Sequence, residues 1–197
     1  KPIIFPCDVT NHKNISDLKN FILEKFSRLD ILINNAGVTF SHDLNNFPEK
    51  YWDETYNVNL KAPFQLSKMF SSTMKKQKSG TIINITSINS ELAFPNNPAY
   101  VTFKGALKQL SKSLALDLGK FGIRVNNVGP GYFRTNMTKK SWENKSRRKN
   151  IENKTMLGRW GKPEDLSGII IFLCSNSSSY ITAQDFYIDG GWISKGL

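Results

Sequence analysis

The stretch from Gly80 to Ser87 restricts the fold of this chain more than any other part of the sequence. Between the glycine and a Thr-Ser pair, residues Thr81 to Ile85 are mostly β-branched and apolar. Such a run is typical of a short strand that is buried on both faces, as strands are in a parallel sheet covered by helices. The sequence therefore predicts an α/β fold built on a parallel sheet.

Ser87 follows this predicted strand directly. In open α/β sheets, ligands bind in the crevice outside the carboxyl ends of the strands. We therefore expect the Ser87 hydroxyl to point toward a bound substrate.

A helix is predicted after the next loop, with Asn97 as its side-chain cap, Pro98 in its first turn and an end near Leu118. Tyr100 and Lys104 are spaced i, i+4 and share one face of this helix. An ammonium group near a phenol favours the phenolate, so we expect Lys104 to lower the pKa of Tyr100 toward the working pH. Tyr100 is therefore a candidate for proton transfer.

A Tyr-x-x-x-Lys pair is not specific by itself, because the chain contains six tyrosines and many lysines. Its value comes from the ordered set of segments around it. They are Cys7-Asp8-Val9-Thr10, Asn34-Asn35-Ala36-Gly37, Asn57-Val58-Asn59-Leu60, Ile83 to Ser87, Tyr100 to Lys104, Arg124 to Gly131, Gly158 to Asp165, and Asp189-Gly190-Gly191-Trp192. With these segments in this order, the chain resembles the short-chain dehydrogenase/reductase family over essentially all of its 197 residues.

The resemblance implies a Rossmann-like, doubly wound parallel sheet in three α/β/α layers, formed by a single domain over residues 1–197. Members of the family begin with a strand and a glycine-rich turn that binds the cofactor pyrophosphate. Here Pro2 to Pro6 already corresponds to the third strand. We expect the first two strand–helix units to be missing from this sequence and to belong to the working protein. The alternative is a non-catalytic fragment that lacks the phosphate-binding loop.

The resemblance also assigns the catalytic residues. Tyr100 is the general acid/base, Lys104 binds the nicotinamide ribose, Ser87 orients the substrate oxygen, and Asn59 supports a water that relays protons. An asparagine in the middle of a helix is unfavourable unless it bonds a specific partner, which gives Asn59 an independent reason for attention. The implied reaction interconverts a secondary alcohol and a ketone with NAD or NADP.

The same resemblance assigns the cofactor-binding residues. The end of the predicted Pro2–Pro6 strand is placed near the adenine, the Asn-Ala-Gly turn along the ribose, and the loop from Pro130 to Thr135 near the carboxamide. Besides Tyr100 and Lys104, these residues are Asp8, Val9, Asn35, Ala36, Gly37, Pro130, Gly131, Phe133 and Thr135.

Hydrophobic spacing and turn residues predict the other elements. We expect helices over Ser16–Phe26, Tyr51–Met74 and from Pro163 through Cys174, and strands over Pro2–Pro6, Ile31–Asn34, Gly122–Val128 and Phe186–Ile188. Two residues depart from the family pattern: Phe103 stands before the catalytic lysine where a small polar residue is usual, and Ala183 stands where glycine is frequent.

Composition excludes several classes of protein. The net charge of +11 would suit a nucleic-acid binder, but the lysines are spread over most predicted helices and no basic strip is interleaved with aromatic residues. Cys7 and Cys174 have neither metal-ligand spacing nor a disulfide framework, so we expect both to be packing residues and no metal site. No stretch approaches 18 apolar residues. We expect a cytoplasmic enzyme.

The basic stretch from Lys139 to Lys149 leaves two interpretations open: a solvated face, or a lid over an anionic substrate. The segments Pro130 to Thr135 and Gly158 to Gly161 look most like those of members that act on sugar acids and polyols, such as gluconate 5-dehydrogenases. The 3-oxoacyl-carrier-protein reductases are nearly as similar.

The predicted helices over 51–74 and 98–118 correspond to helices that pack against a partner subunit in related enzymes. A row of leucines on the second helix supplies more apolar positions than one sheet-facing side needs, although a wide core stripe would explain it as well. They are Leu107, Leu110, Leu114 and Leu118. We expect a homotetramer or a homodimer.

Overall fold

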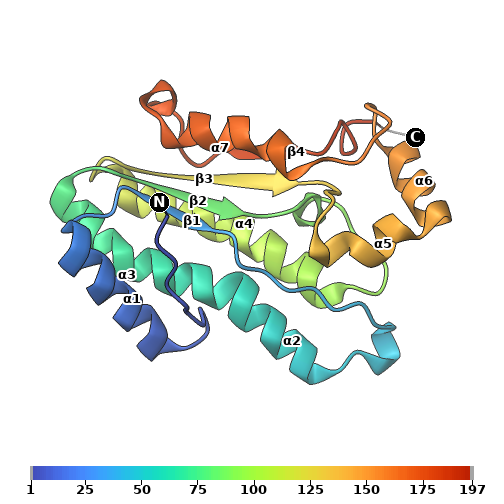
Figure 1. Cartoon of the computed structure of the whole chain (residues 1–197), viewed down its shortest axis with the longest axis horizontal. Helices are drawn as coiled ribbons and strands as arrows, with labels where there is room; N and C mark the ends of the chain where they lie inside the picture. Colours follow the sequence, from blue (N-terminus) through green and yellow to red (C-terminus); the bar gives the residue numbers. More distant parts are fainter. Residues whose placement is uncertain (1, 196–197) are drawn as a thin grey trace.

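A computed structural model describes residues 2–195 and contains one four-stranded sheet, in the order β1-β2-β3-β4 (Figure 1). The strands are β1 (Ile31–Asn34), β2 (Gly80–Ile85), β3 (Ile123–Pro130) and β4 (Asp185–Ile188). All three neighbouring pairs are parallel, so their carboxyl ends lie along one edge. The predicted parallel α/β class is confirmed.

Helices cover both faces of this sheet, and Figure 1 shows α1, α3 and α4 below it and α7 above it. The α-helices are α1 (His12–Phe26), α2 (Glu49–Tyr56), α3 (Ala62–Gln77), α4 (Pro98–Gly119), α5 (Lys139–Glu143), α6 (Lys145–Lys154) and α7 (Ser167–Cys174). The short α5 and α6 lie beyond the carboxyl ends of the strands. No helix in the described part of the chain is long and apolar enough to cross a membrane.

Each covering layer buries its own apolar cluster. Ile82 and Val125 pack with Leu118 of α4 below the sheet, and Ile83 and Val128 pack with α7 above it. Alternate residues of β2 therefore face opposite layers, as the period of a strand requires. All residues of β2 except Ile85 are fully buried, which confirms the prediction of a strand covered on both faces.

The segment that carries the predicted N-terminal strand differs from expectation. Pro2 to Pro6 forms no strand, because none of the described strands pairs with it. β1 is bonded only to β2 among the described strands, and its Ile31 and Ile33 side chains are 39% and 40% exposed. The Pro2–Pro6 strand prediction is therefore wrong for this structure.

Two predicted helices are interrupted. The Tyr51–Met74 helix is divided into α2 and α3 by a π-helical turn, Asn57–Lys61, and the helix from Pro163 begins with a 3₁₀ turn. At α4, the Asn97 side chain does not cap the helix but donates from Nδ2 to Thr39 Oγ1 at 2.9 Å. The asparagine thus ties together the loops that follow β1 and β2.

Two residues with positive φ mark places where the chain turns sharply. Ala183, which departs from the glycine frequent in the family, has a φ of 60°. Gly122 has a φ of 72° in the turn between α4 and β3, and a Cβ added there would lie 2.6 Å from the carbonyl oxygen of Lys78. Only glycine fits this turn without backbone movement.

We expect Gly122→Ala to lower the free energy of unfolding by about 2–3 kcal/mol, because it adds both a left-handed strain and a backbone clash. Chemical denaturation would measure this loss. Gly119→Ala is the matched control, since a Cβ at Gly119 meets no heavy atom of the described residues within 4 Å. In the last turn of a helix, that change should leave stability equal or raise it by up to about 1 kcal/mol. Equal stabilities for both variants would contradict this account of the turn.

Candidate active site

The site is built around the N-terminal half of α4. Lys104 is only 4% exposed, and its Nζ donates to the carbonyl oxygen of Ile85 at 2.6 Å, at the end of β2. The same Nζ lies 5.7 Å from the centre of the Tyr100 ring. The i, i+4 spacing therefore places both side chains on the sheet-facing side of the helix, as predicted.

Burial determines the ionisation of both groups. It raises the pKa of Tyr100 above its usual value, while a hydrogen bond with Ser87 acts in the opposite direction and the neighbouring Tyr132 adds to the increase. Burial also lowers the pKa of Lys104 to about 8. The expectation that the pKa of Tyr100 is lowered is wrong for this structure, because the loss of solvation is the largest effect on the phenol and the opposing effect comes from Ser87.

Ser87 lies where the sequence places it, just after β2. It is 7% exposed and begins the 3₁₀ turn Ile88–Ser90, with its Oγ accepting from the Asn89 backbone N–H at 3.1 Å. This local bond fixes the hydroxyl at the strand end, from where it lowers the pKa of Tyr100 against the effect of burial. Ser87, Tyr100 and Lys104 are thus brought together from two elements.

Asn59 has the specific partner that its mid-helix position required. It is fully buried in the π-helical turn, where its Oδ1 accepts from Val38 N–H at 2.9 Å and its Nδ2 donates to Val38 C=O at 2.8 Å. The wider π turn shifts this side chain out of the α-helical register, and such turns are frequent at functional sites. Asn59 thereby holds the loop that follows β1.

Gly37 connects Asn59 with the catalytic pair. A Cβ at Gly37 would lie 3.5 Å from Asn59 Oδ1 and 3.8 Å from Lys104 Nζ. Gly37, Asn59 and Lys104 therefore border one space.

The predicted adenosine side of the site is a small hollow beside β1. Its volume is about 70 Å³, and its lining includes Val9, Asn35 and Ala36. Asp8 lies next to Val9, with its carboxylate accepting from Thr10 N–H at 2.8 Å. Backbone and side-chain bonds from Thr10 lower the pKa of Asp8, so it is ionised at neutral pH and can accept hydrogen bonds.

These residues fit a nicotinamide dinucleotide. An ammonium group has three donors, and one of the Lys104 donors is used by Ile85. The others are next to the space that Gly37 leaves open, where ribose hydroxyls would find donors. The apolar hollow at Val9 and Ala36 and the ionised Asp8 suit an adenosine.

The loop after β3 contains the remaining predicted cofactor residues. Pro130 ends the strand, and a Cβ at Gly131 would lie 2.9 Å from the Cα of Asp189, so the two strand ends pass closely. Thr135 begins a 3₁₀ turn with a reciprocal capping box to Thr138. The turn fixes the course of the loop past the carboxyl edge of the sheet.

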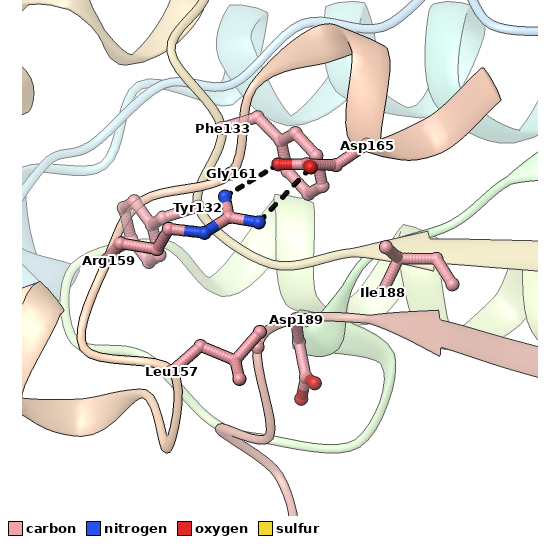
Figure 2. A pocket seen from close by; sticks show the side chains of 9 residues that line it. Tyr132, Phe133, Leu157, Arg159, Gly161, Asp165, Ile188 and Asp189 are labelled. Atoms are coloured by element: carbon pink, nitrogen blue, oxygen red, sulfur yellow. Dashed lines mark hydrogen bonds and ion pairs between the residues drawn. The ribbon is translucent and has the colours of Figure 1, made fainter. Parts of the chain in front are cut away.

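The ring of Phe133, a predicted cofactor-binding residue, packs within the loop. Its ring is 6% exposed and packs on Gly161, where a Cβ would lie 2.6 Å from the ring. Figure 2 shows it in a separate hollow of about 80 Å³, beside the ion pair of Arg159 with Asp165. The Phe133 side chain therefore supports the loop.

An aromatic cluster at the crevice was not predicted from the sequence. Tyr132 stacks on Trp192 with ring centres 5.3 Å apart and meets the edge of Trp160 at the same distance, and Phe94 contacts both Tyr132 and Trp192. The available signal was a tryptophan in two of the matching segments, Trp160 and Trp192, and Tyr132 directly after a third. Because Tyr132 also affects the pKa of Tyr100, this cluster reaches the catalytic group.

The basic stretch is folded against this cluster. The guanidinium carbons of Arg134 and Arg148 lie 3.6 Å and 4.9 Å from the centre of the Trp142 ring, and Trp142 contacts Trp160 edge-on. Cations gain electrostatic energy over an indole face. Arg148 of the basic stretch and Arg134, which precedes the stretch, therefore lie over Trp142. Arg148 is half-buried, and Arg147 is exposed.

Comparison with known proteins identifies the family of this chain. The sequence model of a family described as enoyl-(acyl carrier protein) reductase matches residues 1–193. The chain is 37% identical over 186 residues to a 3-oxoacyl-acyl-carrier-protein reductase of Thermotoga maritima, covering 94% of this chain and 75% of that protein.

Solved structures share the fold over nearly the whole chain. A gluconate 5-dehydrogenase from Burkholderia cenocepacia, in complex with NADP and tartrate, has a TM-score of 0.93 and 32% identity, covering 96% of this chain and 74% of that one. A 4-hydroxyisoleucine dehydrogenase complexed with NADH has a TM-score of 0.90 and 37% identity, covering 96% and 78%. With this fold and these matches, the chain belongs to the short-chain dehydrogenase/reductase family.

Proposed function

We propose that this chain is the catalytic part of an NAD(P)-dependent oxidoreductase that interconverts a secondary alcohol and a ketone, with Ser87, Tyr100 and Lys104 as its catalytic residues. The observation that supports this most is the arrangement of these groups at the carboxyl end of β2, with Lys104 almost fully buried. Open α/β sheets bind their ligands at this edge.

The raised pKa of Tyr100 determines the form that begins the reaction. A protonated phenol can donate its proton to a ketone oxygen as the oxygen gains negative charge, which is general acid catalysis. Ser87 is within hydrogen-bonding reach of Tyr100 and orients the same oxygen. In the direction of alcohol oxidation, Tyr100 accepts the proton, and the positive charge of Lys104 stabilises the phenolate.

A bound nicotinamide would supply or accept the hydride. Lys104 would hold its ribose, with Asn35, Ala36 and Gly37 along the same side, and Pro130 to Thr135 would border the carboxamide. Asp8 and Val9 would contact the adenosine. Asn59 holds the loop that carries Gly37 and would keep a water available to Lys104 for proton exchange with solvent.

For the substrate we propose a sugar acid or a polyol. The gluconate 5-dehydrogenase with bound tartrate, a hydroxy acid, supports this class. Aromatic rings of the Tyr132 cluster offer flat surfaces to a sugar carbon chain, and Arg134 and Arg148 supply positive charge near the crevice. Reduction of 3-oxoacyl-carrier-protein in fatty acid synthesis is the second candidate, because the Thermotoga maritima relative carries that name.

We also propose that the working protein is a homotetramer or homodimer. Of the leucines on α4, Leu107 and Leu118 are buried in the chain itself, whereas Leu116 is 83% exposed and Phe64 on α3 is 44% exposed. Exposed apolar side chains on neighbouring helices are typical of protein contact surfaces. The cytoplasmic location expected from the sequence stays a prediction.

Tyr100→Phe in the complete protein should lower kcat by at least about a hundredfold, because the phenyl ring keeps the packing but has no proton to transfer. The variant should keep its fold and its affinity for NAD(P)H, measured by nucleotide fluorescence titration. Turnover within a few fold of wild type would show that Tyr100 is not the acid/base.

Replacing Arg134 and Arg148 together by glutamine should raise KM for a sugar acid about tenfold or more, the scale of losing a charge-assisted hydrogen bond. KM for the matching neutral polyol should change less than about twofold, and this comparison separates substrate charge from the loss of stacking on Trp142. Steady-state kinetics at low and high salt would measure both.

Arg147→Gln is the matched control, because this residue lies on the same helix, α6, and is exposed. It should leave both KM values unchanged. If the double variant changed KM equally for the acid and the polyol, the basic stretch would be a solvated face and the proposal of an anionic substrate would be wrong.

A further inference from the structure

A row of polar side chains crosses the whole sheet below its catalytic edge. Asn34, Asn84, Asn127 and Asp185 come from β1, β2, β3 and β4, and each is in register with the next across the three strand pairs. The three asparagines are 5% exposed or less. Buried amides are costly unless they are bonded, and among the three asparagines only the Asn34 Oδ1 atom has no hydrogen-bond partner in the described part of the chain.

Hydrogen bonds connect this row, and a helix completes it. Asn34 Nδ2 donates to Asn84 Oδ1 at 2.7 Å, and Asn127 Nδ2 donates to Asp185 Oδ1 at 2.7 Å. Between the two middle strands the connection is the Ser111 hydroxyl of α4, which accepts from Asn84 Nδ2 at 2.7 Å. Its proton has two acceptors, Asn127 Oδ1 at 2.6 Å and the Leu107 carbonyl of its own helix at 3.0 Å, and Asn127 is the nearer.

Ser111 lies on the helix that carries the catalytic pair. It is fully buried and is seven residues, or about two turns, after Lys104 on the same face. Lys104 bonds the carbonyl of Ile85, the residue that follows Asn84 in β2. Helix α4 is therefore attached by hydrogen bonds to adjacent residues of one strand.

Besides a bond from Asn127 Nδ2 to the Lys108 carbonyl and the ion pairs of Lys108 and Lys112 with Asp185, the other contacts of α4 with the sheet are apolar and less directional. Leu107, Ala115 and Leu118 are buried apolar residues of this helix, and their packing energy changes little with a small shift along the strand. A hydrogen bond loses most of its strength when its angle or distance changes. The Ser111 bonds therefore define where α4 lies on β2 and β3.

We propose that Ser111, held between Asn84 and Asn127, is a positioning residue of the reaction. Through the placement of α4 it sets the position of Tyr100 and Lys104 relative to Ser87, which belongs to β2. This proposal rests on the proposed roles of Tyr100 and Lys104. Misplacement of a reacting group by a fraction of the contact distance lowers catalysis far more than binding.

The test compares Ser111→Ala with Ser71→Ala in the complete protein. Both serines are buried, and Ser71 donates to a carbonyl of its own helix, α3, away from the polar row. Ser111→Ala should lower kcat about tenfold with KM changed less than about twofold. Ser71→Ala should leave kcat within about twofold of wild type, and circular dichroism at the assay temperature would confirm that both are folded.

A double variant tests whether Ser111 acts through Lys104. In a Lys104→Met background, Ser111→Ala should lower kcat by a smaller factor than it does in the wild type, because one of the two groups that it positions is gone. Independent, additive losses, or an unchanged kcat in a folded Ser111→Ala, would overturn the proposal. Both outcomes are distinguishable from failure of the proposed function, which would require an active Tyr100→Phe.

If Ser111→Ala does not fold, the end of the row provides the second comparison. Asp185→Asn keeps an acceptor for Asn127 Nδ2, whereas Asp185→Ala removes it. Asp185→Ala should lower kcat relative to Asp185→Asn, because Asn127 loses one of the bonds that orient it toward Ser111. The loss should be only about threefold, because Asn127 keeps its bond to the Lys108 carbonyl of α4. Equal kcat values for these two variants would also overturn the proposal.

Discussion

The bond from Lys104 to the Ile85 carbonyl is the contact on which the rest of the site depends. It places an almost fully buried ammonium at the end of β2, and the ammonium is charged below its lowered pKa of about 8. A buried charge is tolerated only where donors and acceptors surround it. The Ile85 carbonyl is one acceptor for the ammonium, and Gly37 leaves the space beside Nζ open for others. Asn59 holds the loop that carries Gly37.

Much of this arrangement could be predicted from residue spacing, because it depends on local patterns. The β-branched run before Ser87 predicts a buried strand, and the i, i+4 spacing places Tyr100 and Lys104 on one face of α4. The pKa of Tyr100 could not be predicted, because it depends on how deeply the assembled protein buries the phenol. The spacing predicts that the charge of Lys104 lowers the pKa of Tyr100, whereas in this structure burial raises it.

Other features needed contacts between residues far apart in the sequence. Asn97 is a good helix cap by local rules, but its amide bonds Thr39, 58 residues earlier. The row of polar residues across the sheet could not be predicted from the sequence either. Asn34 and Asn84 are single asparagines in mostly apolar strands, and nothing in the sequence shows that they are neighbours. Strand register brings the two side chains together, and the register is established only when the sheet forms.

The two ends of the crevice are held by different kinds of contact. At the catalytic end, hydrogen bonds to backbone and buried amides fix Ser87, Lys104 and α4, and such bonds permit little movement. At the other end, Tyr132 is held by ring packing against Trp160 and Trp192, and Arg134 lies over Trp142. Ring stacking tolerates changes of side chain and angle better than a hydrogen bond does. The loops after β3 can therefore vary with the substrate while the proton-transfer geometry stays constant. Tyr132 links the two ends, because it packs with the tryptophans and raises the pKa of Tyr100.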